Sequence, residues 1–329
     1  MSHPIAIAIH GGCGVLERNE QPEASWRAAR ADLARALMAG RRFLEAGESA
    51  VAAVEAAVAV LEDSAHFNAG HGAALNVAGE HELDASIMDG ATLAAGAVTL
   101  VRRIRNPVRA ARALLERGDT VMLGGPAADA FAASAGLAMV EPGYFTTERR
   151  RATLAAMKAH AAAGSAGSEA EKHGTVGAVA LDALGHLAAA TSTGGFTNKP
   201  AGRIGDSPVI GAGTYARDGV CAVSGTGQGE LFIRHVAAHE VASRIAYRGE
   251  DVEVAVQGVI EELGRSGVGA GMVALDAAGR ITAPYNTGGM FRGWVRADGF
   301  AVVASHGELH SVADDGSVGE APFAGSGSG

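Results

Sequence analysis

One pattern occurs twice in this chain, at residues 179–195 and again at residues 273–289. Both copies read Val-Ala-Leu-Asp-Ala-x-Gly and end on Thr-Gly-Gly. A short Asp-Ala-x-Gly turn between two apolar runs is typical of a β-hairpin. Because helical sequence separates the two hairpins, strands and helices occur in blocks. Blocks favour a layered α+β fold over a doubly wound parallel sheet.

Further elements follow from the spacing of apolar residues. Spacings of three and four positions predict helices at residues 23–45, 49–62, 228–247 and 252–263, with more helical sequence after Asn106-Pro107. Strands are expected at residues 5–9, 83–88 and 94–101. Residues 161–172 are rich in Ala, Gly and Ser and have little apolar bulk, so we expect a flexible linker there.

The junction that follows this linker carries the most informative chemistry. His173-Gly-Thr-Val-Gly runs directly into an apolar strand, so Thr175 begins a buried strand. If the Gly174–Thr175 bond breaks, Thr175 gains an α-amino group with a pKa of about 7.7–8.0, which can accept the proton of its own hydroxyl. Gly174, without a Cβ, tolerates the backbone conformation that this cleavage requires. A Gly-Thr pair before an ordinary strand is the alternative.

Composition excludes several classes of protein. The net charge of -9 opposes binding to nucleic acid, and the short basic stretch at residues 101–107 is expected to be a solvated strand end. No apolar run approaches the roughly 20 residues of a membrane span. Cys13 and Cys221 are far apart and suggest neither a disulfide framework nor a zinc site. Without a recognisable leader, we expect the protein in the cytoplasm.

Two histidines raise a rival enzymatic hypothesis. His235 and His239 are four residues apart in a predicted helix, which would place both imidazoles on one face, as in a metallohydrolase. The order of residues differs from HExxH, and the sequence suggests no third ligand nearby. An ordinary pair of histidines on a helix surface is therefore favoured.

Several longer motifs resemble the plant-type L-asparaginase/isoaspartyl peptidase family of N-terminal nucleophile (Ntn) hydrolases. Four of them follow in family order: His173-Gly-Thr-Val-Gly, Thr191-Ser-Thr-Gly-Gly, Gly202-Arg-Ile-Gly-Asp-Ser-Pro and Ser224-Gly-Thr-Gly-Gln-Gly-Glu. The similarity extends from His10-Gly-Gly to Asn286-Thr-Gly-Gly-Met-Phe-Arg and so covers nearly the whole chain. It implies a four-layer αββα sandwich of two antiparallel sheets.

The resemblance also implies a role for each motif residue. Thr175 would be the nucleophile freed by autoproteolysis after Gly174, with Thr193 supporting its activation. Arg203 would bind the substrate α-carboxylate and Asp206 its α-ammonium, which suits a rigid guanidinium fork beside a carboxylate. Thr226 and Gly227 would stabilise the oxyanion, and Gly229 would line the same pocket. An Arg–Asp surface pair is the alternative for the clamp.

In the first half of the chain, residues 61–71 resemble the family's sodium loop. The backbone carbonyls that would bind a structural Na⁺ belong to Leu61, Glu62, Ser64, Phe67, Ala69 and His71. Carbonyl oxygens suit a hard cation. Asn68, within this loop, would help to hold the cleaved Thr175. An ordinary helix-to-loop turn is the alternative, and no organic cofactor is expected.

The activity implied by the resemblance is hydrolysis of β-aspartyl (isoaspartyl) dipeptides and of L-asparagine to L-aspartate. The chain would form one domain, cleaved into an α subunit (residues 1–174) and a β subunit (residues 175–329), and two such heterodimers would pair. Substrates would be small amino acids or dipeptides. A glycosylasparaginase is the runner-up, although those enzymes typically carry Asp where Gly174 stands. An uncleaved binding protein of the same fold is the other alternative.

Overall fold

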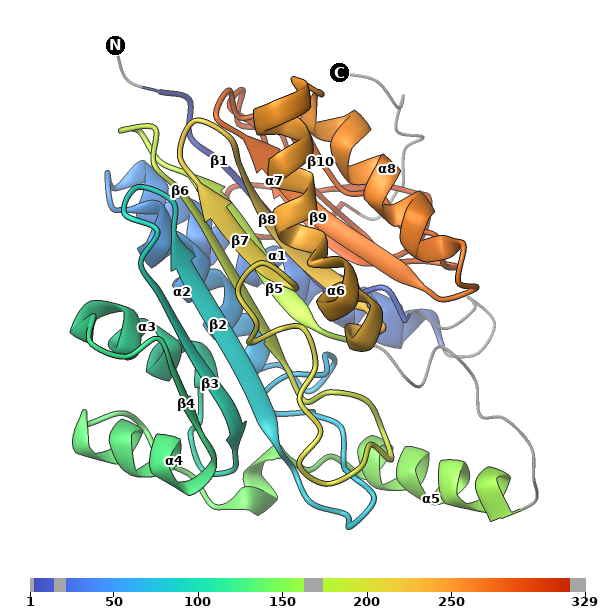
Figure 1. The fold of residues 1–329 in the computed structure, drawn as a ribbon. Helices are drawn as coiled ribbons and strands as arrows, with labels where there is room; N and C mark the ends of the chain where they lie inside the picture. The colour runs from blue at the N-terminus through green and yellow to red at the C-terminus, as the bar shows by residue number, and fades with distance from the viewer. Residues whose placement is uncertain (1–2, 15–21, 163–173, 320–329) are drawn as a thin grey trace.

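The computed structural model of the protein describes residues 3–14, 22–162 and 174–319 (Figure 1). Its helices are α1 (Glu23–Glu45), α2 (Ala50–Glu62), α3 (Pro107–Arg117), α4 (Gly125–Ser134), α5 (Glu148–Ala162), α6 (Gly229–His235), α7 (Ala237–Arg248) and α8 (Val252–Gly264), with a short 3-10 turn at Pro142–Phe145. Its strands are β1 (Ala6–Gly12), β2 (Leu83–Asp89), β3 (Ala95–Val101), β4 (Met122–Gly124), β5 (Val176–Leu181), β6 (Leu187–Thr193), β7 (Thr214–Arg217), β8 (Cys221–Gly227), β9 (Ala270–Asp276), β10 (Ile281–Thr282), β11 (Phe291–Val295), β12 (Ala301–Ala304) and β13 (His310–Ser311). The predicted linker contributes residues 161 and 162 to the end of α5, and its residues 163–172 lie outside the described ranges.

Two sheets packed face to face form the middle of the molecule (Figure 1). Helices α1, α2 and α3 pack on the outer face of the larger sheet, and α7 and α8 pack on the outer face of the smaller one. The predicted α+β class and the four-layer αββα sandwich are therefore confirmed. Each sheet has apolar residues on both faces because each is covered on both sides.

The larger sheet has nine strands in the order β13-β12-β11-β1-β5-β6-β2-β3-β4. Strands from before and after the Gly174–Thr175 junction alternate in this order, and β5 lies in the middle, between β1 and β6. Neighbours run antiparallel, as expected, except that β4 is parallel to β3. Neither half of the chain therefore holds a complete sheet.

Both predicted hairpins are confirmed, and they lie in different sheets. β5 pairs with β6 in the larger sheet, and β9 pairs with the short β10 in the smaller sheet, whose order is β10-β9-β8-β7. The same residue type shapes both turns. Asp182 Oδ1 accepts the backbone N–H of His186 at 3.0 Å, and Asp276 Oδ1 accepts that of Arg280 at 3.0 Å. Because these Asp contacts are made within four residues, the turns could be predicted from the sequence.

Alternation along β5 divides the core into layers. Val176 and Ala178 pack against the helices of the outer layer, whereas Val179 and Leu181 pack between the two sheets. A third apolar cluster joins the smaller sheet to α7 and α8. Because side chains on a strand point alternately to opposite faces, β5 contributes to two of these clusters at once.

The predicted helix at residues 228–247 is wrong in one respect, because it consists of two helices. α6 ends at His235, and α7 begins at Ala237, with Val236 between them in the left-handed region at φ 49°. The N–H of Ala238 donates to the Ala212 carbonyl at 3.0 Å and that of His239 to Gly211 at 2.8 Å. Contacts with a distant loop thus replace the bonds that a continuous helix would make.

The basic stretch at residues 101–107 closes β3, as predicted. Its arginines are held at the surface by ion pairs: Arg102 with Glu82, Arg103 with Glu141 and Arg105 with Asp63. These pairs neutralise the stretch, so it presents no uncompensated basic surface for a polyanion. None of the helices in the described ranges has the length and apolar character needed to cross a membrane.

Candidate active site

Thr175 lies immediately before β5, beside the end of β6, which closes on Thr193. The Thr175 hydroxyl donates to the Thr193 hydroxyl oxygen over 3.2 Å, and both side chains are almost completely buried. Thr193 Oγ1 also accepts the Gly195 N–H at 3.0 Å. Thr193 is thereby fixed as an acceptor that orients the Thr175 hydroxyl.

A small pocket opens over these two threonines. It is lined by Thr175, Thr193, Gly195, Phe196, Arg203, Asp206 and Gly227. The structure therefore brings together five of the residues predicted for the site, from four separate segments of the chain. Phe196 and Gly195 are additional to that prediction.

The Gly174–Thr175 junction is enclosed by residues from the first half of the chain. The backbone N–H of Asn68 donates to the Gly174 carbonyl at 3.2 Å. Asn68 Nδ2 donates to the Gly195 carbonyl at 2.5 Å, while its Oδ1 accepts the Ala74 N–H at 2.6 Å. Gly12, at φ 104°, passes so close that a Cβ there would lie 2.6 Å from Gly174 Cα. Asn68 and Gly12 thus fix the position of the Gly174 carbonyl.

Arg203 enters the pocket with its guanidinium already oriented. Its Nε and Nη2 each lie 3.0 Å from a carboxylate oxygen of Glu230, and its Cζ lies 4.8 Å from the centre of the Phe196 ring. The side chain retains 13% of its exposure. Glu230 occupies one edge of the planar fork, so the orientation of the guanidinium in the pocket is set by contacts within the protein.

Asp206 lies beside Arg203 and is buried. Burial raises the pKa of its carboxyl to about 7, against the opposing effects of its own backbone N–H and the Arg203 charge. Among the described residues, Asp206 Oδ2 has no hydrogen-bond partner. A Cβ at Gly229 would lie 2.7 Å from Arg203 Nη2 and 2.8 Å from Asp206 Oδ1, so Gly229 packs against both. A carboxylate in this setting gains most from a cationic partner supplied by a ligand.

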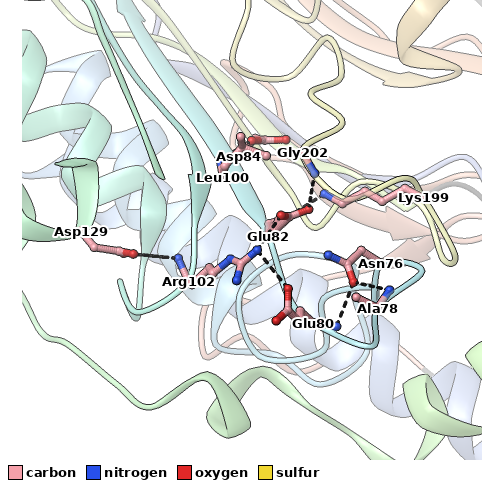
Figure 2. A network of polar contacts seen from close by, with 10 residues as sticks. All are labelled: Asn76, Ala78, Glu80, Glu82, Asp84, Leu100, Arg102, Asp129, Lys199 and Gly202. Carbon is pink, nitrogen blue, oxygen red and sulfur yellow. Dashed lines mark hydrogen bonds and ion pairs between the residues drawn. The ribbon is translucent and has the colours of Figure 1, made fainter. Parts of the chain in front are cut away.

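The loop that carries Arg203 is anchored to the residue just before β2 by a polar network around the buried Glu82 (Figure 2). Glu82 accepts three hydrogen bonds: from Gly202 N at 3.0 Å and Arg102 Nη2 at 2.8 Å to its carboxylate, and from the buried Lys199 Nζ at 2.8 Å to its backbone carbonyl. Asp84 lies nearby and accepts the Leu100 N–H at 2.9 Å. These contacts limit the movement of Arg203 relative to the sheet.

The predicted oxyanion residues differ in their placement. Gly227 lines the pocket, whereas Thr226 is fully buried one residue earlier on β8 and its hydroxyl oxygen accepts the Cys13 N–H at 3.4 Å. Burial also raises the pKa of the Cys13 thiol to about 12, so that it stays protonated. The oxyanion role of Thr226 and Gly227 stays a prediction.

The loop at residues 61–71, which contains Asn68, folds back on itself. The His71 N–H donates to the Glu62 carbonyl at 2.6 Å, and a Cβ at Gly72 would lie 2.8 Å from the Phe67 carbonyl oxygen and 2.9 Å from that of Ala65. Of these carbonyls, those of Glu62 and Phe67 are in the predicted donor set, whereas the Ala65 carbonyl accepts from Arg149 Nη2 at 3.2 Å. Carbonyl oxygens suit a hard cation, and sodium binding by this loop stays a prediction.

The metallohydrolase hypothesis requires both imidazoles on one helix face, and that prediction is wrong. His235 ends α6 and His239 lies in α7, so the two imidazoles do not share one helix face. His235 Nδ1 is 3.4 Å from Glu262 Oε1, and the His239 ring packs edge-on against Tyr215 with centroids 5.0 Å apart. Each histidine thus has a separate environment.

The sequence motifs assign no role to four residues around the site: His10, Gly195, Phe196 and Glu230. His10 and Glu230 lie inside motifs that carry the resemblance, where a histidine within an apolar strand and a carboxylate after the Gly-Thr-Gly-Gln-Gly loop are the signals that point to them. Phe196 follows Gly195 directly, but only the folded loop places its ring on Arg203.

Comparison with known proteins shows the family to which this chain belongs. A family model described as asparaginase matches residues 3–304. The chain is 46% identical to the isoaspartyl peptidase of Salmonella typhimurium over 295 residues, which cover 88% of this chain and 94% of that protein. It is 46% identical over 297 residues to the isoaspartyl peptidase of Escherichia coli, covering 88% and 92%. To the isoaspartyl peptidase/L-asparaginase of Xenopus laevis it is 39% identical over 302 residues, covering 92% and 96%. The resemblance seen in the sequence is confirmed, and the chain belongs to the asparaginase family.

Proposed function

We propose that this protein is an isoaspartyl peptidase and L-asparaginase whose nucleophile, Thr175, is released by cleavage of its own chain after Gly174. The observation that carries the proposal is the pocket in which Thr175, Thr193, Arg203 and Asp206 meet. It combines a buried hydroxyl with a cation and an anion suited to a zwitterionic amino acid. The names of the relatives, isoaspartyl peptidase and isoaspartyl peptidase/L-asparaginase, agree with such substrates.

The contacts of the junction support self-cleavage. Asn68 N–H polarises the Gly174 carbonyl, and the Thr175 hydroxyl attacks its carbon. The Gly174–Thr175 C–N bond breaks, the hydroxyl proton passes to the Thr175 nitrogen, and Gly174 is left as an ester on Thr175 Oγ1. Water hydrolyses that ester, which frees the Gly174 carboxylate and restores the hydroxyl beside a new α-amino group.

Substrate hydrolysis reuses the same nucleophile. Arg203 holds the substrate α-carboxylate and Asp206 its α-ammonium, which directs the side-chain carbonyl toward Thr175. Attack by Thr175 Oγ1 transfers the hydroxyl proton to the α-amino group, which then protonates the departing ammonia or amine. The N–H of Gly227, with Thr226, stabilises the oxyanion. Water releases L-aspartate from the acyl-enzyme.

The cleaved halves, residues 1–174 and 175–329, remain one structural domain in this proposal because their strands alternate in one sheet. Two such heterodimers pair. Carbonyls of the 61–71 loop hold a structural Na⁺, which would fix the loop and thereby Asn68. Nothing in the reaction needs an organic cofactor.

The test begins with the intact mass of freshly purified protein beside a Thr175→Ala variant. We expect two fragments from the wild type, one ending at Gly174 and one beginning at Thr175, and a single chain from the variant. Aspartate release from asparagine and from a β-aspartyl dipeptide is then measured for both proteins. A wild type that stays whole after long incubation and releases no aspartate contradicts the proposal.

A further inference from the structure

His10 connects the nucleophile to the interface between the two sheets. It lies on β1, directly opposite Gly177 of β5, and is fully buried. Its Nδ1 is 3.1 Å from the Thr175 carbonyl oxygen and its Nε2 is 2.9 Å from Ser224 Oγ. A carbonyl can only accept, so Nδ1 carries the hydrogen. Nε2 of the neutral ring then accepts from the Ser224 hydroxyl.

A chain of buried hydroxyl groups continues from Ser224. Ser224 Oγ and Thr191 Oγ1 are 2.7 Å apart, and Thr214 Oγ1 donates to Thr191 Oγ1 at 2.5 Å. Ser86 Oγ lies 2.8 Å from Thr214 Oγ1. Ser86 Oγ donates to the Ser207 carbonyl at 2.6 Å. Because Nδ1 of His10 carries the hydrogen, Ser224 donates to Nε2. Each hydroxyl has one hydrogen, so Thr191 then donates to Ser224 and Thr214 to Thr191.

The far end of the chain lies next to the substrate clamp. Ser207, whose carbonyl accepts from Ser86, follows Asp206 directly in sequence. The hydrogen bonds run from the Thr175 backbone through His10, Ser224 and Thr191 to Thr214. Ser86 lies 2.8 Å from Thr214 Oγ1 and is bonded to the segment that carries Asp206. The hydroxyls alternate between the sheets, because Ser224 and Thr214 are paired residues of β8 and β7 in the smaller sheet and Thr191 lies on β6 of the larger one.

Space for this contact depends on Gly177. A Cβ at that position would lie 2.0 Å from Ser224 Oγ and 2.5 Å from His10 Nε2. Any larger residue would separate the ring from Ser224. The glycine two residues after the nucleophile thus has a specific purpose, which is to let the imidazole and the hydroxyl meet.

Burial keeps the ring neutral. Desolvation lowers the pKa of His10 to about 3, although the hydrogen bond to the Thr175 carbonyl acts in the opposite direction. His10 is therefore a fixed hydrogen-bond donor toward Thr175, and its Nε2 lone pair is already occupied by Ser224.

The Thr175 carbonyl needs such a donor more once the chain is cut. Register pairs of β5 begin at Val176 with β6 and at Gly177 with β1, so Thr175 lies beyond both ladders. Cleavage removes the covalent restraint on its nitrogen side. What remains is the bond to Val176 and the contacts of the carbonyl and side chain.

We propose that His10 is a positioning residue: its Nδ1–H holds the backbone carbonyl of Thr175, so that the hydroxyl and the released amino group stay aligned with the pocket. This inference rests on the proposed function, since it assigns a task in that reaction. His10 touches no substrate. It acts through the backbone of Thr175.

Two matched variants test this role. In His10→Asn the amide nitrogen can occupy the place of Nδ1 and donate to Thr175, whereas in His10→Gln the amide reaches the place of Nε2 and loses that donor. We expect His10→Asn to keep kcat within about threefold and His10→Gln to lower kcat by about 10²-fold, the effect of misplacing a reactive group by about 1 Å. KM should change little in either variant because the clamp is intact.

Thermal unfolding and hydrogen exchange separate positioning from folding. Hydrogen exchange of the segment at residues 175–178 should quicken in His10→Gln relative to His10→Asn, whether or not the protein is active. Equal kcat in the two variants, or a loss confined to KM, overturns the inference. If the wild type itself is uncleaved and inactive, the proposed function fails, and equal exchange in the two variants would then overturn the role of His10 as well.

Discussion

Glu230 holds the guanidinium of Arg203 by its Nε and Nη2 atoms, at 3.0 Å from each. Arg203 also lines the pocket that contains Thr175. In the proposed reaction, a substrate α-carboxylate would therefore meet a cation whose orientation is already set, so less of the binding free energy would be spent on ordering it.

Replacing this carboxylate should weaken substrate binding. In Glu230→Gln one charged acceptor is lost, and we expect KM for asparagine to rise about tenfold with kcat nearly unchanged, as for a hydrogen bond to a charged group worth about 1.5 kcal/mol. Steady-state kinetics of the cleaved enzyme provide the measurement. A fall in kcat at constant KM would instead place Glu230 in the chemical step.

The raised pKa of Asp206 should appear in the pH profile. Below a pKa of about 7, the carboxyl of the free enzyme is protonated and cannot pair with the substrate ammonium, so KM should rise as pH falls through 7. The bound ammonium keeps Asp206 ionised in the complex, so kcat should follow the Thr175 amino group instead. Asp206→Asn should show a KM that is raised at least about tenfold and no longer depends on pH in this range. A wild-type KM that is constant from pH 6 to pH 8 would contradict this.

Glu62 should make stability depend on pH. It is fully buried, and burial raises the pKa of its carboxyl to about 8, although Ser192 and Val108 donate hydrogen bonds to Oε1. The unfolded chain has a pKa of about 4.3, so between the two values only the folded state holds the proton. The free energy of unfolding should therefore fall as pH rises from about 4.3 to 8, by on the order of 1 kcal/mol per pH unit.

Glu62→Gln should remove this slope while keeping an acceptor for Ser192. Its advantage over the wild type in urea unfolding should widen from pH 5 to pH 8. Glu253→Gln, at an exposed position at the start of α8, is the control and should leave the slope unchanged. Parallel curves for Glu62→Gln and wild type would show that Glu62 ionises in the folded protein without cost.

The junction of α6 and α7 should tolerate glycine better than its native residue. Val236 is half exposed at φ 49°, a conformation that a β-branched residue adopts only at a cost. Val236→Gly should raise the free energy of unfolding by about 1 kcal/mol. Val254→Gly, at an exposed position in the helix α8, should lower it. Destabilisation by both changes would mean that the packing of Val236 outweighs its backbone strain.

Sequence could predict those parts whose causes are local. α1 runs from Glu23 to Glu45, as its apolar spacing indicated, and Asp182 and Asp276 shape their turns through contacts within a few residues. The break at Val236 carries no glycine or proline, because it depends on carbonyls of Gly211 and Ala212 that only the folded chain supplies. β4 and its parallel pairing with β3 likewise depend on the fold, since three residues give too short a pattern.

The same distinction between local and long-range causes applies to the residues of the candidate site. Thr175, Thr193, Arg203 and Asp206 could be named from contiguous motifs, and one pocket contains all four. The partners that orient them could not, because His10 reaches Thr175 across 165 residues of sequence and Ser224 across 214. Such contacts arise from the packing of one sheet on another, and their residue types alone do not reveal them.

The alternation of strands from both halves in the nine-stranded sheet has a consequence for the proposed self-cleavage. The first half of the chain supplies the contacts of His10, Gly12 and Asn68 with the junction, and the second half supplies Thr193. The Thr175 hydroxyl is therefore aligned with the Gly174–Thr175 bond only after both halves have assembled into the sheet. A chain that stops short of this state keeps its bond and has no free amino group at Thr175. If Thr175 is freed as proposed, cleavage is therefore confined to molecules that have already folded, and the cleaved fraction reports how many have done so.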